Sequence, residues 1–187
     1  GNAEPSSLYD SSPLGGTLAQ LVDFERLNAG APRYSATAVD IESGEDVAFD
    51  SQVDRIAPEH VRASSALLPA FPPVEIGGRL LADAGISANL PLDLVLAEPG
   101  DAPLLCIAID LLPLAGPRPS TLGEVASRMQ DLTFATQSRR SIAAWQAIFD
   151  AGAANGAVPS VTLLHIDYAA QGREVSGKAF DFSPESA

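Results

Sequence analysis

The feature that most constrains the fold is a long, almost entirely apolar run, A-P-L-L-C-I-A-I-D-L-L, at residues 102–112. A strand with one face in water alternates apolar and polar residues, whereas a strand buried on both faces of a parallel sheet is apolar throughout. We therefore expect residues 102–112 to form a strand buried on both faces. A second β-rich run lies at 161–168, and a long helical pattern at 118–152 separates the two. Strands that alternate with helices indicate an α/β fold.

Shorter patterns precede this region. Apolar spacing predicts a helix over residues 17–30, and two β-rich runs about an E-S-G-E turn predict a hairpin over 33–50. Pro58 suits the first turn of a helix that ends before the Pro72-Pro73 pair. The stretch V-E-I-G-G-R-L-L predicts a second hairpin, a short helix follows Pro91, and Thr121 with Glu124 fits a capping box for the long helix. We expect residues 1–13 to form an arm and 14–187 to form one α/β portion.

Charge and cysteine content exclude several classes of protein. The formal net charge is −13, which argues against binding to nucleic acid or to anionic membranes, because both require clustered Lys and Arg. One cysteine, Cys106, excludes an internal disulfide framework. We find no secretion signal and no apolar run long enough to span a membrane, so we expect a cytoplasmic protein.

Few residues show the spacing of a known catalytic motif. His60 and His165 are far apart in sequence and lack metal-ligand spacing, so we expect no metal site. The strand-to-helix elbow G-x-S-x-G, which exposes the serine of many hydrolases, is absent from the 187 residues. Ser64 and Ser65 lack flanking glycines, and the simplest interpretation is hydrogen bonding at a helix end. A weaker alternative pairs one of them with Asp83.

Asp83 is the acid that most needs an explanation, because it stands in the apolar stretch L-A-D-A-G-I-S-A-N-L-P-L at residues 81–92. A carboxylate at a strand end, followed by small residues, can point into a cleft at the edge of an α/β sheet. It can equally form an Asx turn, in which it accepts hydrogen bonds from its own backbone. Local sequence leaves both interpretations open.

A wider comparison adds to the case for Asp83. The segments P-E-H-V-R-A-S-S-A-L-L-P-A-F-P-P, L-A-D-A-G and N-L-P-L, with S-R-M-Q-D-L-T-F-A-T-Q-S-R-R further on, resemble the C-terminal half of bacterial patatin-like phospholipases, from about Ser7 to Phe180. That resemblance implies a partial three-layer α/β/α fold with a mixed, mostly parallel sheet. It also implies a lipid acyl hydrolase that uses a Ser–Asp dyad and requires no metal or organic cofactor. Asp83 matches the acid of the family's D-G-[GA] motif and would be the general base. Gly85 would shape its turn, and Asn89 would support the loop that follows.

The sequence departs from the family pattern in two places. Ala84 replaces the middle glycine, which would cost roughly 1 kcal/mol if that position requires a positive φ. The N-terminal half, with the nucleophilic serine and the oxyanion loop, is not in these residues. We therefore expect the chain alone to be inactive. It would be a truncated portion of a phospholipase or esterase, a subunit whose partner or oligomer supplies the serine, or a degenerate binding or interaction protein. Without the other half, the strands at 102–112 and 161–168 would leave an open sheet edge.

Overall fold

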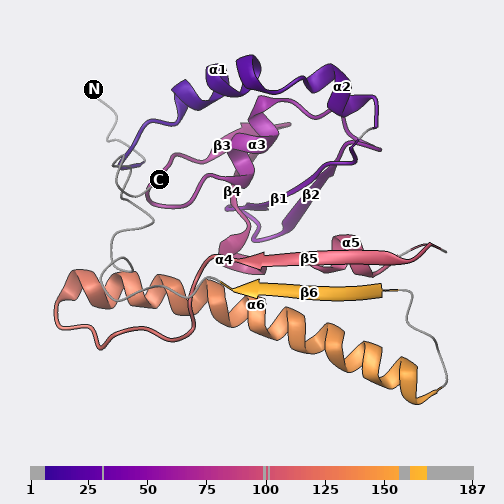
Figure 1. Cartoon of the computed structure of the whole chain (residues 1–187). Coiled ribbons are helices and arrows are strands. Elements are labelled where there is room, and N and C mark those ends of the chain that lie inside the picture. Colours follow the sequence, from indigo (N-terminus) through magenta and orange to yellow (C-terminus); the bar gives the residue numbers. More distant parts are fainter. Residues whose placement is uncertain (1–6, 31, 99, 101, 156–160, 168–187) are drawn as a thin grey trace, which may run out of the picture. The chain divides into compact units, whose positions relative to one another are not determined.

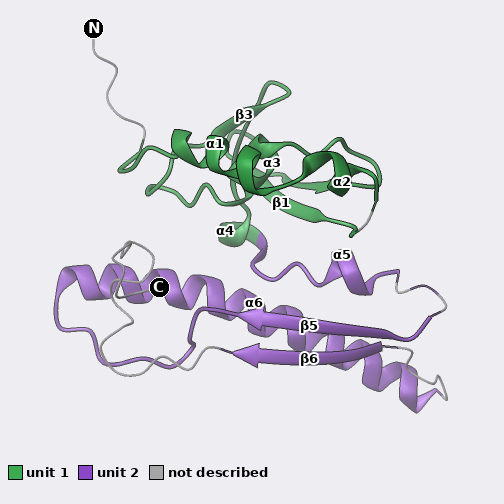
Figure 2. Cartoon of the chain, turned by 45° about the horizontal axis from the view of Figure 1, so that its top comes forward, with its two compact units in different colours: residues 1–87 green, residues 88–187 purple. Residues whose placement is uncertain are grey.

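The computed structural model describes residues 7–30, 32–98, 100, 102–155 and 161–167. These residues group into two compact units, 1–87 and 88–187 (Figure 2). We describe each unit by itself. The grouping of residues 14–187 in one domain stays a prediction.

The first unit is built on a four-stranded sheet with the order β2-β1-β4-β3 (Figure 1). Every neighbouring pair in this sheet is antiparallel. Both predicted hairpins are confirmed, as β1–β2 and as β3–β4. The elements are α1 (Ser12–Leu21), α2 (Phe24–Asn28), β1 (Ser35–Asp40), β2 (Asp46–Asp50), α3 (Pro58–Ser64), β3 (Val74–Ile76) and β4 (Arg79–Asp83), and α4 (Gly85–Ala88) crosses the boundary at residue 87.

The core of this unit lies between the sheet and α3. Ala38 and Leu81 from the strands are buried against Ile56, Ala63 and Ala66. Side chains of α2 and its surroundings add partly buried contacts, including those of Phe24 and Leu27. Burial of these apolar groups fixes the end of β4, and with it Asp83, in the framework.

One helix was predicted across residues 17–30, but the structure has two. α1 ends at Leu21 and α2 begins at Phe24. The Asp23 side chain accepts a hydrogen bond from the Arg26 backbone N–H at 3.0 Å and so caps α2. A carboxylate that caps the next turn competes with continuation of the helix, which explains the break.

The second unit pairs two parallel strands with a long helix. β5 (Leu104–Asp110) lies beside β6 (Val161–Asp167) in parallel register, and α6 (Leu122–Ala154) connects them; a short helix, α5 (Asp93–Leu96), precedes them. Thr121 and Glu124 form the predicted capping box at the start of α6. The core joins Cys106 and Ala108 of β5 to Ile142 of α6, so α6 packs on one face of the strand pair.

The α/β class is confirmed, whereas the expectation of a mostly parallel sheet is not met. Short hairpin loops join β1 to β2 and β3 to β4, and such loops allow only antiparallel pairing. Parallel pairing needs a long crossover, and among the described strands α6 provides one only for β5 and β6.

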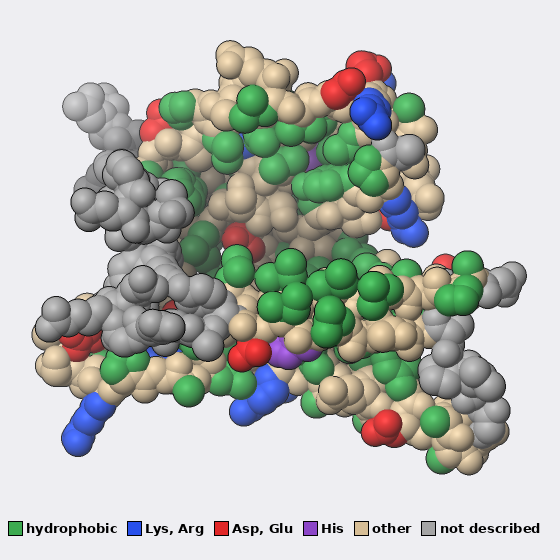
Figure 3. All heavy atoms as spheres, viewed as in Figure 1, with side chains coloured by type: hydrophobic (Ala, Val, Ile, Leu, Met, Phe, Trp, Pro, Cys, Tyr) green, Lys and Arg blue, Asp and Glu red, His purple; other side chains and the backbone are tan. Residues whose placement is uncertain are grey.

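The prediction that β5 is buried on both faces is wrong. Its burial alternates: Cys106 and Ala108 are buried, whereas Ile107 is 52% exposed. The strand is apolar on both sides, but in the described residues the helix covers only one of them. The exposed apolar residues of the two strands, which we call the outer face, are Leu105, Ile107, Ile109, Leu164 and Ile166 (Figure 3).

Candidate functional site around Asp83

Asp83 is the last residue of β4, and its position is fixed by backbone contacts on two sides. It is paired in register with Ala38 of β1. Its backbone N–H donates to the Ala66 carbonyl at 3.1 Å, which ties the strand end to the segment after α3. A carboxylate held in this way has little freedom to move, as a positioned general base requires.

The Asp83 side chain accepts a hydrogen bond from the Gly85 backbone N–H, with 2.8 Å between N and Oδ1. Gly85 is the first residue of α4. This contact is the Asx turn that local sequence suggested. It also orients the carboxylate, so the turn and a catalytic role are compatible.

Burial raises the pKa of the Asp83 carboxyl above its ordinary value, and the hydrogen bond from Gly85 offsets only part of this effect. A carboxylate with a raised pKa is a stronger base than a solvated aspartate. Perturbed carboxylates of this kind are frequent at catalytic sites, although they also occur in purely structural roles.

Ala84 does not strain the turn. Among the described non-glycine residues, a positive φ occurs at Leu90 (61°) and not at Ala84. The Ala84 side chain is buried. The left-handed cost considered for this position therefore does not arise, and alanine fits where the family motif has glycine.

Asn89 belongs to the second unit. Its backbone N–H donates to Gln137 Oε1 at 3.0 Å, and its Nδ2 donates to Ser138 Oγ at 2.9 Å. Both partners lie on α6, so Asn89 attaches its loop to that helix. A contribution of Asn89 to the Asp83 site stays a prediction.

The Ser65 hydroxyl makes the helix-end hydrogen bonds that its position in the sequence predicts. Its Oγ donates to the carbonyls of Val61 and Arg62, at 2.9 and 3.2 Å. The structure thus gives Ser65 a local hydrogen-bonding role at the end of α3, where Ser64 is the last helical residue.

Sequence reasoning passed over Ser87, whose Oγ is 2.5 Å from Asp46 Oδ1 and 2.9 Å from the Ala84 carbonyl. Both Ser87 and Asp46 are exposed. The signal in the sequence is G-I-S-A-N at residues 85–89, which keeps the first glycine and the serine of G-x-S-x-G but ends in asparagine. The hydroxyl ties α4 to the start of β2.

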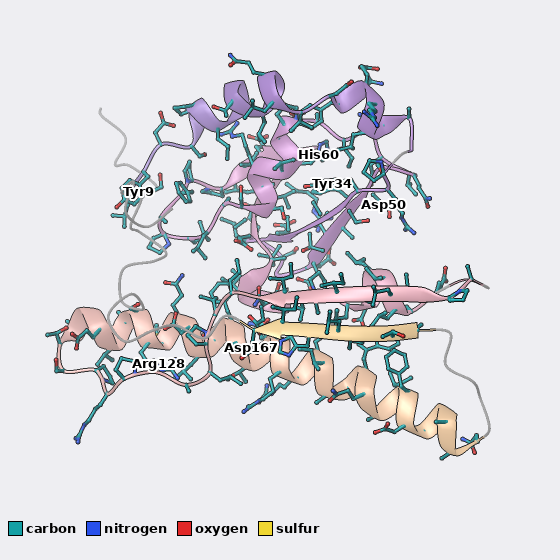
Figure 4. The ribbon with its side chains drawn as sticks, in the orientation of Figure 1. Tyr9, Tyr34, Asp50, His60, Arg128 and Asp167 are labelled. Carbon is teal, nitrogen blue, oxygen red and sulfur yellow. The ribbon has the colours of Figure 1, made fainter. Side chains whose placement is uncertain are left out.

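His60 has a structural role (Figure 4). Its Nδ1 accepts a hydrogen bond from the Ala57 backbone N–H at 2.9 Å, and its ring lies edge-on to Phe49 with 4.6 Å between centroids. Within the described residues no group of three His, Cys, Asp or Glu side chains is arranged to hold a metal ion.

Comparison with known proteins identifies the family. The family model described as patatin-like phospholipase matches residues 1–96, more than half of the chain. The chain belongs to the patatin-like phospholipase family. The matched segment of this patatin-like chain includes Asp83, Gly85 and Asn89. No match was found among curated proteins. None of the helices in the described part of the chain is long and apolar enough to cross a membrane.

Proposed function

We propose that this chain is a portion of a lipid acyl hydrolase, with Asp83 as the general base of a Ser–Asp dyad. The observation that carries the proposal is the family match over a segment that includes Asp83. Its position at the end of β4 and its carboxylate held by Gly85 support the same role.

The nucleophilic serine, in this proposal, lies on polypeptide outside these 187 residues, either a preceding half or a second chain. Asp83 would take the serine proton as the hydroxyl attacks the carbonyl carbon of an acyl ester. The alcohol leaves, the acyl group stays on serine, and water then releases the fatty acid. The substrate is a phospholipid, an acylglycerol or a related lipid ester, and no metal or cofactor takes part.

The test is Asp83→Asn in the assembly that contains the serine. Asparagine keeps the acceptor for Gly85 but cannot take a proton. We expect ester hydrolysis to fall by about 10²-fold or more, the usual scale for a lost general base. Glu75→Gln, an exposed acid on β3 of the same hairpin, is the matched control and should keep full activity. Unchanged turnover in Asp83→Asn would remove Asp83 from the mechanism.

A serine-reactive fluorophosphonate probe locates the nucleophile. We expect the probe to label a serine on the additional polypeptide in native extract and to leave the 187-residue chain unlabelled. Labelling of the isolated chain at Ser87, abolished by Ser87→Ala, would show instead that the nucleophile lies within these residues.

The second candidate is a non-catalytic binding or interaction protein of the same family. The Asx-turn hydrogen bond from Gly85 to Asp83 is equally compatible with this alternative, because a purely structural carboxylate makes the same contact. This alternative predicts no serine labelling in native extract, and full folding of Asp83→Asn without any functional consequence.

A further inference from the structure

A hydrogen bond between Ser87 and Asp46 anchors the short helix that carries the hydrogen-bond donor to Asp83. Ser87 Oγ lies 2.5 Å from Asp46 Oδ1 and 2.9 Å from the Ala84 carbonyl oxygen. A hydroxyl has one proton, and a carboxylate is a stronger acceptor than a neutral carbonyl. The Ser87 hydroxyl therefore donates preferentially to Asp46, which joins the third residue of α4 to the first residue of β2.

The register of the sheet brings these two residues together, although they are 41 positions apart. Val39 of β1 is paired with Asp46 on one side and with Ala82 on the other. Side chains at paired positions share one face of a sheet, and successive side chains along a strand point to opposite faces. Asp46 therefore shares a face with Ala82, whereas the neighbouring Asp83 lies on the face toward α3. The Ser87 contact thus holds α4 from the face opposite to the Asp83 side chain.

The orientation of the Asp83 carboxylate depends on the position of α4, which directly follows β4 (Figure 1). The backbone N–H of Gly85, the first residue of α4, donates to Asp83 Oδ1 at 2.8 Å, and Gly85 is buried. α4 has only 4 residues, and a helix of this length is not stable by itself. Contacts with the rest of the fold therefore determine where α4 lies, and the bond from Ser87 to Asp46 is one of them.

We propose that Ser87 and Asp46 are positioning residues for Asp83: their hydrogen bond holds α4 so that its first N–H group fixes the orientation of the Asp83 carboxylate. This role rests on the proposed function, in which Asp83 takes the proton of the serine. A general base acts only within hydrogen-bond reach of the proton that it accepts, so a carboxylate that turns freely spends less time in the productive orientation. Loss of either positioning residue should therefore slow catalysis rather than weaken the binding of substrate.

Amide hydrogen exchange of the 187-residue chain, followed by NMR, tests the structural step without any enzyme activity. The Gly85 amide reports on its bond to Asp83, and the Asp83 amide, which donates to the Ala66 carbonyl at 3.1 Å, reports on the end of β4. We expect Ser87→Ala to speed exchange of the Gly85 amide about tenfold, the scale of one charge-assisted hydrogen bond, and to leave the Asp83 amide unchanged. Equal acceleration at both amides would show general destabilisation and would overturn the proposal.

Asp46→Ala should have the same effect as Ser87→Ala, and the double variant should add nothing, because each change removes the same hydrogen bond. Ser87→Thr keeps the hydroxyl and should keep the slow exchange of the Gly85 amide. Ser35→Ala is the matched control, because Ser35 Oγ also donates to a carboxylate, Asp50 Oδ2 at 3.0 Å, at the other end of the same hairpin. It should leave the Gly85 amide unchanged. Additive effects of Ser87→Ala and Asp46→Ala, or an equal effect of Ser35→Ala, would contradict the role of this pair.

Steady-state kinetics of the assembly that contains the serine tests the catalytic step. We expect Ser87→Ala and Asp46→Ala to lower kcat for ester hydrolysis about tenfold with KM unchanged, and Ser87→Thr to keep the full rate. Unchanged kcat in both alanine variants, or an unchanged Gly85 amide in Ser87→Ala, would overturn the positioning role and leave the proposed function of Asp83 intact. Full turnover in Asp83→Asn would overturn the proposed function, and with it the catalytic meaning of the pair, whatever the exchange rates are.

Discussion

At the scale of single residues, two aspartates show how the surroundings of a carboxylate decide whether it stabilises or destabilises the folded protein. Asp40 accepts from Arg79 Nε at 2.8 Å and from the Glu42 backbone N–H at 3.0 Å. These bonds lower the pKa of Asp40 to about 2, with the Arg79 bond first among the causes. Asp131 is buried in α6 and its Oδ2 has no hydrogen bond. Burial raises its pKa, and Arg128, 3.8 Å away, offsets only part of this.

Asp40→Asn should lower the melting temperature at neutral pH by a few degrees. The folded-state pKa of Asp40 lies below its ordinary 3.8, so its contribution is present above that value and is lost as the pH falls toward about 2. Thermal unfolding across this range checks the expectation. Glu42→Gln, an exposed acid in the same turn, is the control. A deficit for Asp40→Asn that persists below the folded pKa would contradict the ion-pair explanation.

Asp131→Asn should stabilise the protein at neutral pH. The folded-state pKa lies above the ordinary 3.8, so the unfolded chain loses its proton first and the carboxylate costs stability as the pH rises through that value. Asparagine removes the buried charge. We expect a melting temperature a few degrees higher at neutral pH and no difference in acid, with exposed Asp150→Asn unchanged. Destabilisation at neutral pH would show that Arg128 outweighs burial.

At the scale of elements, local chemistry could be predicted from sequence. The G-G turn and the hairpin about residues 42–45 were recognised because their residues specify the turn, and Gly77 and Gly78 do take positive φ. The capping box at Thr121 was recognised for the same reason. What could not be predicted depends on distant partners: the pairing of β1 with β4, and the exposure of one side of β5. The apolar composition of a strand indicates that its faces can be buried, but it does not indicate which part of the chain packs against each face.

The capping box gives the element-scale prediction. Thr121 Oγ1 accepts from the Glu124 backbone N–H at 3.2 Å, and Glu124 Oε2 accepts from the Thr121 backbone N–H at 3.1 Å. Thr121→Ala should cost about 1 kcal/mol of unfolding free energy, measured by urea titration. Thr133→Ala is the control, because Thr133 only donates to the Met129 carbonyl within the same helix. An equal loss of unfolding free energy in both variants would show that the capping hydrogen bond does not stabilise the protein.

The candidate site shows the same limit at a larger scale. Asp83 and its Gly85 turn could be predicted because the two residues are neighbours in sequence. The attachment of Asn89 to α6 joins residues 48 and 49 positions apart, and no local pattern announces it. The contact between Ser87 and Asp46, which are 41 positions apart, could not be predicted for the same reason.

At the scale of the whole molecule, the outer face of β5 and β6 predicts how the isolated chain associates in solution. Its five apolar residues are each 47% exposed or more. Among the described strands, β5 and β6 pair only with each other, so each has one edge without a described neighbour. Exposed apolar patches and open strand edges both promote association. We therefore expect the 187-residue chain alone to self-associate through the outer face.

Light scattering on the isolated chain tests this expectation. We expect oligomers for the unmodified chain and a monomer when Ile107→Lys and Ile109→Lys are combined, because lysine on the outer face blocks apolar packing and edge pairing. Leu122→Lys is the matched control, because Leu122 is an 86% exposed apolar residue that begins α6 and is not part of the outer face. It should leave association unchanged. A monomeric unmodified chain would contradict this expectation and would show that the outer face does not drive association.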